Sequence, residues 1–497
     1  MVQTGSYGEF VGHITLTVDT GTGEVVDHAA VNVPRTSTPW EELVETYPRV
    51  QAVKDVLDPA LAEAEVIGAQ PVGEVTADIT TAFTGGSYVD GEYVGPGPLP
   101  TTGRDDRASE SALGNLVASS LRDTLADPAR GGADLGVVNP GGLRNELLVG
   151  EDGVITYAEA NAVLPFVNNL WTVTLTGAQV VELLEQQWQT NPDGTRPSRP
   201  YLALGLSDNV SWTAATADPN AEPGDNVLSV TIDGEPVDPD AEYRVATFSF
   251  LATGGDNFRV FTEGTDPRDS GLVDREAWIA YLQENSPLSP SFARSRVVVG
   301  DLPGAVAAGE DVSVELSGLD LTSLGAPQNT EVTGYLVPRD EELDPEDPGE
   351  AVATAPVVDG AATLTATVPA DAAEGAYDLW VVASPSGTTA RVPVTVEAAV
   401  PSGVDLRVTA QARCLAGNVY LAVRATNGED VAIDVRHYTP FGEKRFAAVQ
   451  PGASAYTAYA TRRSSIEDGS VTVAGYVPGQ TPRYEQHKVS FEGITCG

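Results

Sequence analysis

The sequence predicts a multidomain protein in which an α+β domain of the α/β type is followed by two all-β sandwich modules. Three observations lead to this prediction. At 497 residues the chain is too long for a single hydrophobic core. Helix-like and strand-like periodicities are mixed up to about residue 295, and after it only short strand-like segments remain. A Pro-Ser-Gly break at 401–403 then divides the all-β part into two.

The composition is that of a loop-rich protein without a membrane-spanning segment. Hydrophobic residues make up 41% and charged residues 20%, with 50 Gly and 35 Pro. The net charge of −43 repels nucleic acid and anionic membrane surfaces, so neither is an expected partner. Residues 402–497 differ, because they hold ten basic and nine acidic residues and leave −44 to the rest. This difference either favours contact with the cell envelope or has no functional meaning.

The two cysteines, Cys414 and Cys496, are expected to form a disulfide that closes the last module end to end. Pairing is favoured over two unrelated buried thiols, because a lone cysteine beside a chain end needs a reason to be there. By loop entropy the bond stabilises by roughly 4 kcal/mol. It implies an oxidising compartment, so we expect a secreted or cell-surface protein. The first residues lack the basic start and apolar segment of a signal peptide, from which we expect the true N-terminus to be missing.

Two segments precede the α+β domain. Within residues 1–35, apolar and polar residues alternate as in two strands, and because a lone hairpin is marginal in water we expect the edge of a further domain. Residues 36–71 are predicted to be a helical connector packed on its neighbours. Pro48 and Pro59 are each expected to restart its helix.

Residues 72–295 are predicted to form the α+β domain. Thr176 and Gln179 match a capping box, so a helix is expected to start there and to carry Trp188. The other predicted elements, in order, are a strand at 75–79, a loop at 85–102, a helix after Glu110, a strand at 135–138, a helix at 155–164 and strands at 171–175, 227–232 and 243–247.

The remaining residues are predicted to be all-β. Residues 296–400 are expected to form an immunoglobulin-like sandwich and residues 401–497 a second sandwich, closed by the disulfide. The strands expected in the first module are 297–300, 312–316, 332–336, 362–368 and 377–382.

The segment from Val137 to Arg144 is the strongest candidate for a binding loop. An apolar strand end runs into a loop without bulk at Gly141 and Gly142, with Asn139 before it and Arg144 after it. Glycines allow backbone N–H groups to approach a ligand closely, and a guanidinium group matches two oxygens of a phosphate or carboxylate. The loop alone is a weak signal, because such a sequence is more often a plain surface turn.

Four segments, in order, resemble the C-terminal substrate-binding domain of the 5'-nucleotidase family. They are RASESALGN at 107–115, NPGGLR at 139–144, AVLPFVN at 162–168 and FLATGGDNF at 250–258. They correspond to the family's Arg-x-x-Glu-x-x-x-Gly-Asn, Asn-x-Gly-Gly-Ile-Arg, Val-Leu-Pro-Phe-Gly-Asn and Phe-Leu-Ala-x-Gly-Gly-Asp-Gly-Phe segments. Pro140 and Val167, the latter where the family usually has Gly, are departures from that pattern.

The resemblance implies a site for a nucleotide or nucleoside. Two aromatic rings would enclose the base, a carboxylate would accept hydrogen bonds from the ribose, and the remaining groups would hold the phosphate and the base edge. In that order the implied residues are Phe166 and Phe250 for the base, Asp256 for the ribose, Arg107, Asn139, Arg144, Gly141 and Gly142 for the phosphate or other polar groups, and Asn168 for the base edge.

In the resembling family the chemistry belongs to an N-terminal metallophosphatase domain with two divalent metal ions. None of its ligand segments (Asp-x-His, Gly-Asp-x-x-Asp, Gly-Asn-His, Gly-His-x-His) occurs here, and the four histidines lack metal-ligand spacing. Residues 1–35 resemble the closing strands of that domain. We therefore expect no cofactor in this chain and two metal ions in a missing N-terminal domain.

The main hypothesis is that the chain is the nucleotide-recognition part of a secreted 5'-nucleotidase-type hydrolase, which releases nucleoside and phosphate in nucleotide catabolism. Alone it is expected to bind nucleotides weakly and to hydrolyse nothing. Two alternatives stay open: a non-catalytic nucleotide-binding protein, and a cell-surface attachment protein that uses its β modules. The family includes enzymes for monophosphates, cyclic nucleotides and nucleotide sugars, so the substrate among these stays open.

Overall fold

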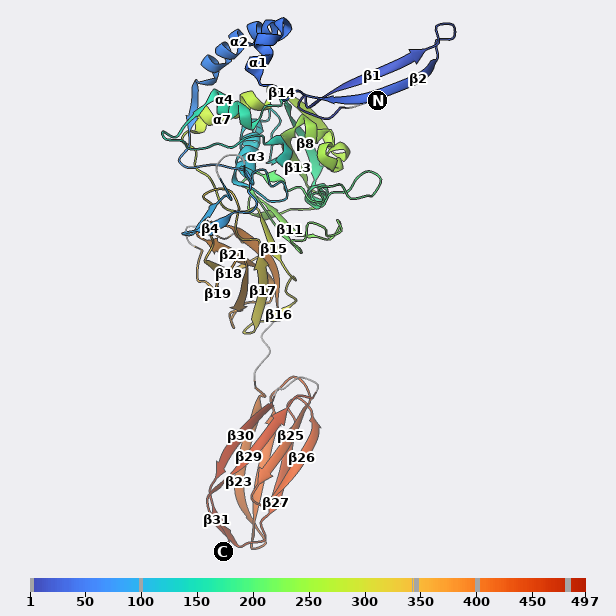
Figure 1. Ribbon diagram of the computed structural model, residues 1–497. Helices are drawn as coiled ribbons and strands as arrows, with labels where there is room; N and C mark the ends of the chain where they lie inside the picture. Colours follow the sequence, from blue (N-terminus) through green and yellow to red (C-terminus); the bar gives the residue numbers. More distant parts are fainter. Residues whose placement is uncertain (1–3, 98–101, 342, 344–347, 398–402, 479–483) are drawn as a thin grey trace.

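The computed structural model describes all residues except 1–3, 98–101, 342, 344–347, 398–402 and 479–483. Figure 1 shows an N-terminal hairpin and two helices on a mixed α/β body, strands that continue from that body, and a last all-β unit. Within this description, no helix has both the length and the apolar content that a bilayer crossing requires.

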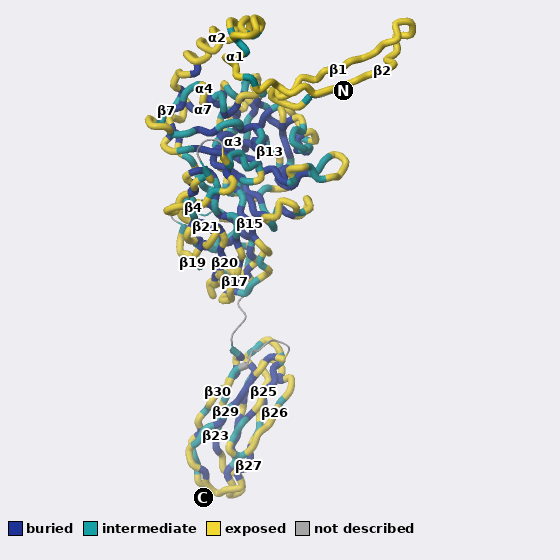
Figure 2. The backbone as a smooth tube through the Cα atoms, in the orientation of Figure 1, coloured by how far each residue is buried: buried dark blue, intermediate teal, exposed yellow. Residues whose placement is uncertain are grey.

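The hairpin consists of β1 (Phe10–Val18) and β2 (Val25–Pro34), which pair antiparallel along their length and project from the body (Figure 1). Every residue of both strands is exposed, as the yellow tube in Figure 2 shows. The predicted strands are present. Their origin in a metallophosphatase domain stays a prediction.

The helices α1 (Trp40–Thr46) and α2 (Pro48–Gly68) follow the hairpin. The prediction that this segment packs on its neighbours is wrong, because Gly68 is the one buried residue of the two helices. The prediction that Pro59 restarts the helix is also wrong, since α2 runs through it. Pro59 removes one backbone hydrogen bond, and on an exposed helix water can satisfy the carbonyl oxygen that loses its donor.

The body is built around a five-stranded sheet with the order β14-β8-β13-β6-β9, in which β6 and β13 are parallel. The elements from residue 71 to 295 are β3 (Pro71–Glu74), β4 (Ser87–Val89), β5 (Glu92–Val94), α3 (Ala112–Leu125), β6 (Leu135–Val138), β7 (Val154–Thr156), α4 (Tyr157–Val163), β8 (Asn169–Thr176), α5 (Gly177–Glu185), β9 (Gly205–Leu206), β10 (Val210–Ala214), β11 (Val227–Ile232), β12 (Glu235–Pro236), β13 (Glu242–Phe248), α6 (Ser249–Ala252), β14 (Thr265–Val273) and α7 (Asp274–Asn285), with 3-10 turns at Pro140–Gly142, Gly255–Asn257 and Arg259–Glu263.

This sheet is covered on both faces. Successive strand residues point to opposite sides, so Val137 packs in the core that includes α5, whereas Val138 packs in the core that includes α3 and α7. The capping box of Thr176 on α5 is confirmed. Trp188 is not on α5, because the helix ends at Glu185, and its ring is instead buried against Tyr201 and Trp212.

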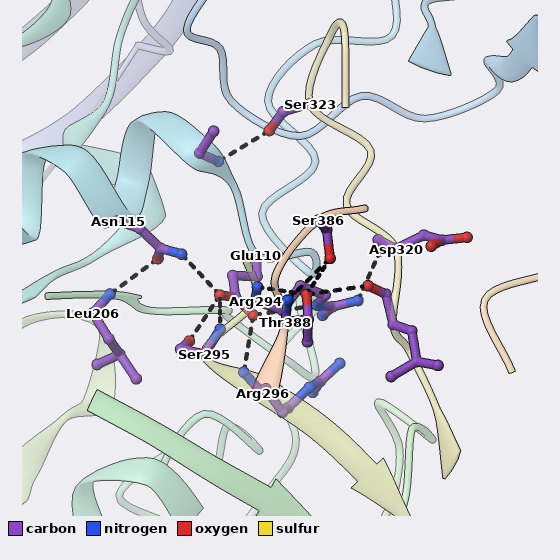
Figure 3. A network of polar contacts seen from close by, with 12 residues as sticks. Glu110, Asn115, Leu206, Arg294, Ser295, Arg296, Asp320, Ser323, Ser386 and Thr388 are labelled. Carbon is purple, nitrogen blue, oxygen red and sulfur yellow. Dashed lines mark hydrogen bonds and ion pairs between the residues drawn. The ribbon is translucent and has the colours of Figure 1, made fainter. Parts of the chain in front are cut away.

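A second sheet joins the body to the strands that follow it, in the order β12-β11-β10-β15-β17-β20. Strand β10 pairs in parallel with β15 (Arg296–Val299), so the predicted boundary at residue 296 lies at the start of a strand shared with the body. Beside this junction, buried Glu110 accepts hydrogen bonds from Ser295 and pairs with Arg294 (Figure 3).

The strands of residues 296–397 lie in two sheets, the one shared with the body and a second with the order β16-β22-β21-β18-β19, and a hydrophobic core lies between them. Their strands are β15 (Arg296–Val299), β16 (Val306–Ala307), β17 (Asp311–Ser317), β18 (Glu331–Pro338), β19 (Ala353–Pro356), β20 (Ala362–Thr367), β21 (Gly375–Ser384) and β22 (Thr389–Glu397). The alternating burial of β17 and β20 explains why their period-two pattern was legible in the sequence.

The last unit has its own core between two further sheets, ordered β23-β24-β27 and β26-β25-β29-β30. Its strands are β23 (Leu406–Leu415), β24 (Asn418–Asn427), β25 (Ile433–Thr439), β26 (Gly442–Val449), β27 (Ser454–Ala460), β28 (Ser465–Ile466), β29 (Gly469–Tyr476), β30 (Tyr484–Phe491) and β31 (Ile494–Thr495). Cys414 and Cys496 form the predicted disulfide.

Candidate functional site

The four predicted segments meet at a cavity of about 390 Å³. Parallel strands end at the same edge of a sheet, so the loops after β6 and β13 emerge side by side there. The cavity is lined by Arg107, Asn139, Gly141, Gly142, Phe166, Asn168, Phe248, Phe250 and Asp256. Eight of the nine predicted site residues are therefore in the lining, and the ninth, Arg144, lies beside it.

The glycines of the loop after β6 lie in tight contact with their neighbours. A Cβ atom at Gly141 would lie 3.0 Å from Nη1 of Arg107, and one at Gly142 would lie 3.1 Å from a ring carbon of Phe248. Both distances are shorter than most Cβ contacts, so a side chain at either position would require its neighbour to shift by a few tenths of an ångström. The loop therefore keeps its backbone at the cavity surface, as its sequence predicted.

Asn139 and Asp256 connect the two loops. The side-chain amide of Asn139, which is 4% exposed, donates to Oδ2 of Asp256 over 2.7 Å. Asp256 has a φ of 50°, in the left-handed region that Asp tolerates better than most residues. Within the described residues its Oδ1 has no hydrogen-bond partner, so this oxygen is available to accept from a ligand.

The two arginines are held differently. Nε of Arg107 donates to both carboxylate oxygens of Asp105, each at 3.0 Å, and this leaves Nη1 at the glycine loop. Arg144 donates from Nη1 to the carbonyl oxygen of Gly141 over 3.3 Å, and its guanidinium carbon lies 5.6 Å from the ring centroid of Phe166. Arg144 therefore stacks on a cavity ring without lining the cavity itself.

Two phenylalanine rings stand at the cavity with large exposed fractions, 56% for Phe166 and 43% for Phe250. Phenylalanine is more often buried, so two half-exposed rings at one cavity indicate a binding surface. Phe248, which sequence reasoning missed, forms the buried back of the cavity with 1% exposure. The sequence offered one indication of Phe248: it stands at the end of β13, only two residues before Phe250.

Asn168 is fixed by a carboxylate that sequence reasoning also missed. Its backbone and side-chain N–H groups donate to the same oxygen of buried Asp274, at 3.0 and 2.9 Å. Burial raises the pKa of Asp274, although these hydrogen bonds oppose the shift. The neighbouring Val167 has a φ of 60°, which is a strained conformation for a β-branched residue.

The described residues do not fit the two-metal centre of the resembling family. They include no group of three or more His, Cys, Asp or Glu side chains that could hold a metal ion. We therefore derive no chemical step through a metal.

The region that holds the cavity is similar in sequence to known proteins. Residues 91–263, which contain the glycine loop and both phenylalanines, match the model of the family described as "5'-nucleotidase, C-terminal domain". The trifunctional nucleotide phosphoesterase YfkN of Bacillus subtilis is 29% identical over 289 residues, 57% of this chain and 17% of that protein. Protein UshA of Salmonella pullorum is 37% identical over 163 residues, 33% of this chain and 26% of that protein.

A further relative is the cell wall protein Lmo0130 of Listeria monocytogenes, 33% identical over 189 residues, which are 36% of this chain and 22% of that protein. The chain thus spans about a quarter or less of the length of these curated relatives. The part of the chain that holds the cavity, residues 91–263, therefore corresponds to the C-terminal domain of the 5'-nucleotidase family.

Proposed function

We propose that the cavity binds a nucleotide or nucleoside, and that the chain is the nucleotide-recognition part of a 5'-nucleotidase-type phosphoester hydrolase. The observation that supports this best is the pair of half-exposed rings, Phe166 and Phe250, at a cavity that also holds polar groups for a ribose and a phosphate. Stacking on aromatic rings contributes about 1–3 kcal/mol per base and is largely independent of the base.

The role proposed for each polar residue follows from the atoms that it has available for a ligand. Asp256 offers Oδ1 to ribose hydroxyls, and Asn139 holds that carboxylate in place. Nη1 of Arg107 lies close to Gly141 and the guanidinium of Arg144 donates to the carbonyl oxygen of the same residue, so a phosphate or another polar group of the ligand would be held beside Gly141. In an intact enzyme these groups would present the phosphate to a metal centre, which two divalent ions would form.

Calorimetric titration of the chain with adenosine and AMP tests this proposal. The double variant Phe166→Ala, Phe250→Ala is expected to weaken binding of both ligands at least 30-fold, about 2 kcal/mol, because both lose their stacked base. The matched control is Phe10→Ala, Tyr47→Ala, two exposed aromatic residues outside the cavity, which should bind as the unmodified chain does. Equal affinities for all three proteins would contradict the proposal.

A second comparison separates the phosphate from the base. Arg144→Gln removes a guanidinium beside the glycine loop and is expected to weaken AMP binding several-fold while leaving adenosine binding nearly unchanged. An equal loss for both ligands would mean that Arg144 acts on Phe166 rather than on the phosphate. Release of inorganic phosphate from AMP by the purified chain with added divalent metal would contradict the proposal that the chain recognises nucleotides without hydrolysing them.

We also propose that the protein works outside the cytosol, as a secreted or cell-surface protein with sandwich-type β modules. The disulfide between Cys414 and Cys496 supports this, because such bonds persist in oxidising compartments. A relative with the name of a cell wall protein points the same way. Fractionation of the producing cells with an antibody against residues 402–497 tests it, and a signal confined to the cytosol would contradict it.

A further inference from the structure

One sheet of the last unit carries positive charge on its outer face and no carboxylate. None of the residues of β23, β24 and β27 is Asp or Glu, although 71 of the 497 residues, about one in seven, are acidic. We use the name arginine face for the outward side chains Arg407, Thr409, Arg413, Tyr420, Arg424 and Tyr456. The strands that carry this face belong to the last unit, which Figure 1 shows apart from the body.

The strand register shows that these side chains share one surface. Leu421 and Val423 of the central strand are fully buried, so the alternate residues Tyr420 and Arg424 point outward. Arg424 pairs with Thr409 on one side and with Tyr456 on the other. Arg413 and Tyr420 form the next-but-one row along the sheet.

The three arginines are free of counter-charges. The guanidinium of Arg424 lies over the ring of Tyr456 at 5.4 Å, and Arg413 donates to the neutral side chain of Gln411 at 2.8 Å. None of the three arginines, Arg407, Arg413 and Arg424, forms an ion pair with another described residue. The opposite sheet is different, because there Arg445 pairs with Asp434 at 2.7 Å. The positive charge of the arginine face is therefore available to a partner.

We propose that the arginine face binds an extended polymer of phosphodiester-linked polyols, of the kind found in cell envelopes. At about 3.4 Å per residue, Arg407 and Arg413 stand about 20 Å apart along β23, and Arg424 lies about 7 Å along the sheet from Arg407. Guanidinium groups match phosphate oxygens in pairs. Thr409 and the tyrosine hydroxyls supply hydrogen bonds to the polyol units between the phosphates.

Charge complementarity alone would also suit a nucleic acid, but the tyrosines favour the polyol polymer. Binding of single-stranded nucleic acid relies on aromatic rings that are open for base stacking. Here Tyr420 lies four residues along β24 from Arg424, the residue that pairs with Tyr456, a separation of about 14 Å, so the face has no two neighbouring rings on which successive bases could stack.

The test is binding of the full chain to immobilised poly(glycerol phosphate) at 50 and 200 mM NaCl. Neutralising three phosphates is expected to weaken binding about 20-fold between these salt concentrations. Free glycerol phosphate should bind at least tenfold more weakly than the polymer, because it reaches one arginine only. The variant Arg407→Gln, Arg413→Gln, Arg424→Gln should lose polymer binding while it retains AMP binding, which keeps this proposal separate from the proposed nucleotide site.

The matched control is Arg436→Gln, Lys444→Gln, Lys488→Gln, which removes the same charge from the other sheet and should bind the polymer as the unmodified chain does. Thr409→Glu is an independent variant that places a carboxylate beside Arg424 without removing a cation, and it should also weaken binding; far-UV circular dichroism verifies that each variant is folded. No binding at 50 mM NaCl, equal losses in both triple variants, or tighter binding to oligo-dT than to the polymer would each overturn the proposal.

Discussion

The buried carboxylate of Glu110 is predicted to stabilise the junction between the body and the strands after residue 295. It accepts from the backbone N–H of Ser295 at 2.6 Å and from the side chain of Asn115 at 2.8 Å, and it pairs with Arg294 at 3.3 Å (Figure 3). Glu110 is 5% exposed and the Arg294 side chain 9%. Glu110→Gln keeps the volume of the side chain but leaves the guanidinium of Arg294 buried without its counter-charge. Breaking a buried pair in this way costs about 3–5 kcal/mol.

Tryptophan fluorescence during urea unfolding at pH 7 measures this cost. All six tryptophans precede residue 402, so the signal follows the body and the adjoining strands without the last unit. The matched control is Glu276→Gln, an exposed glutamate whose side chain is 69% exposed, for which we expect a change within about 0.5 kcal/mol. Glu110→Gln with Arg294→Met should recover part of the loss, because the uncompensated charge is then removed. A loss below about 1 kcal/mol for Glu110→Gln, or a loss equal to that of Glu276→Gln, would refute this reasoning.

The carboxylate of Glu110 also makes the stability of the fold depend on pH. Burial alone would raise the pKa of Glu110, but Arg294 and the hydrogen bonds from Ser295 outweigh it and hold the pKa below its ordinary value. A carboxylate with a lowered folded-state pKa stabilises the fold above its unfolded-state pKa, and this stability is lost as the pH falls below about 4.5. In Glu110→Gln this part of the acid sensitivity should be absent.

Three other predictions concern separate parts of the chain. Val167→Gly should raise the free energy of unfolding by about 1 kcal/mol in the same assay, because glycine adopts the left-handed φ of 60° without strain, and a decrease would contradict this. His437, fully buried with neither ring nitrogen hydrogen-bonded among the described residues, has its pKa lowered to about 4 by burial and by Lys444. The free energy of unfolding of the last unit should therefore fall by up to about 3 kcal/mol as the pH falls from about 6.5 to about 4. If circular-dichroism melts of a His437→Phe variant show the same loss, protonation of His437 is not its cause. The double variant Cys414→Ser, Cys496→Ser should lower the free energy of unfolding of the last unit by about 4 kcal/mol, because the disulfide closes a loop with a sequence separation of 82. An unchanged melting temperature would contradict this entropic account.

The sequence was sufficient to predict those features of the structure whose signal is local or comes from the family resemblance. The glycine loop was legible because Gly141 and Gly142 stand shortly after an apolar strand, and the structure shows that a Cβ atom at either position would be in tight contact with a neighbour. The capping box at Thr176 depends on side chains three residues apart, so it too was visible. Phe166 and Phe250 reach the same cavity, but it was the family resemblance that singled them out, because nothing local distinguishes them from core phenylalanines.

The sequence was insufficient where partners are far apart in the chain. Strand periodicity predicted β15 but not β10, and it does not show that two strands pair across about 80 residues, so the sheet shared at residue 296 was not foreseen. Glu110 and Arg294 are 184 residues apart, and no spacing rule connects them. The exposure of α2 and its continuation through Pro59 depend on the absence of packing around it, which a periodicity analysis of the helix alone does not reveal.

The two β modules differ in how they are connected to the proposed nucleotide site, because only the first shares a sheet with the body. Glu110 belongs to the segment that begins with Arg107, so one wall of the cavity is connected through Glu110 and Arg294 to strand β15 and to the sheet that continues into β17 and β20. Substitutions in these strands should therefore alter the stability of the cavity wall without touching a ligand. The arginine face has no such connection among the described residues, since its sheet pairs only within the last unit. Loss of nucleotide binding and loss of polymer binding should consequently be separable, and variants of β24 should change the second while leaving the first intact.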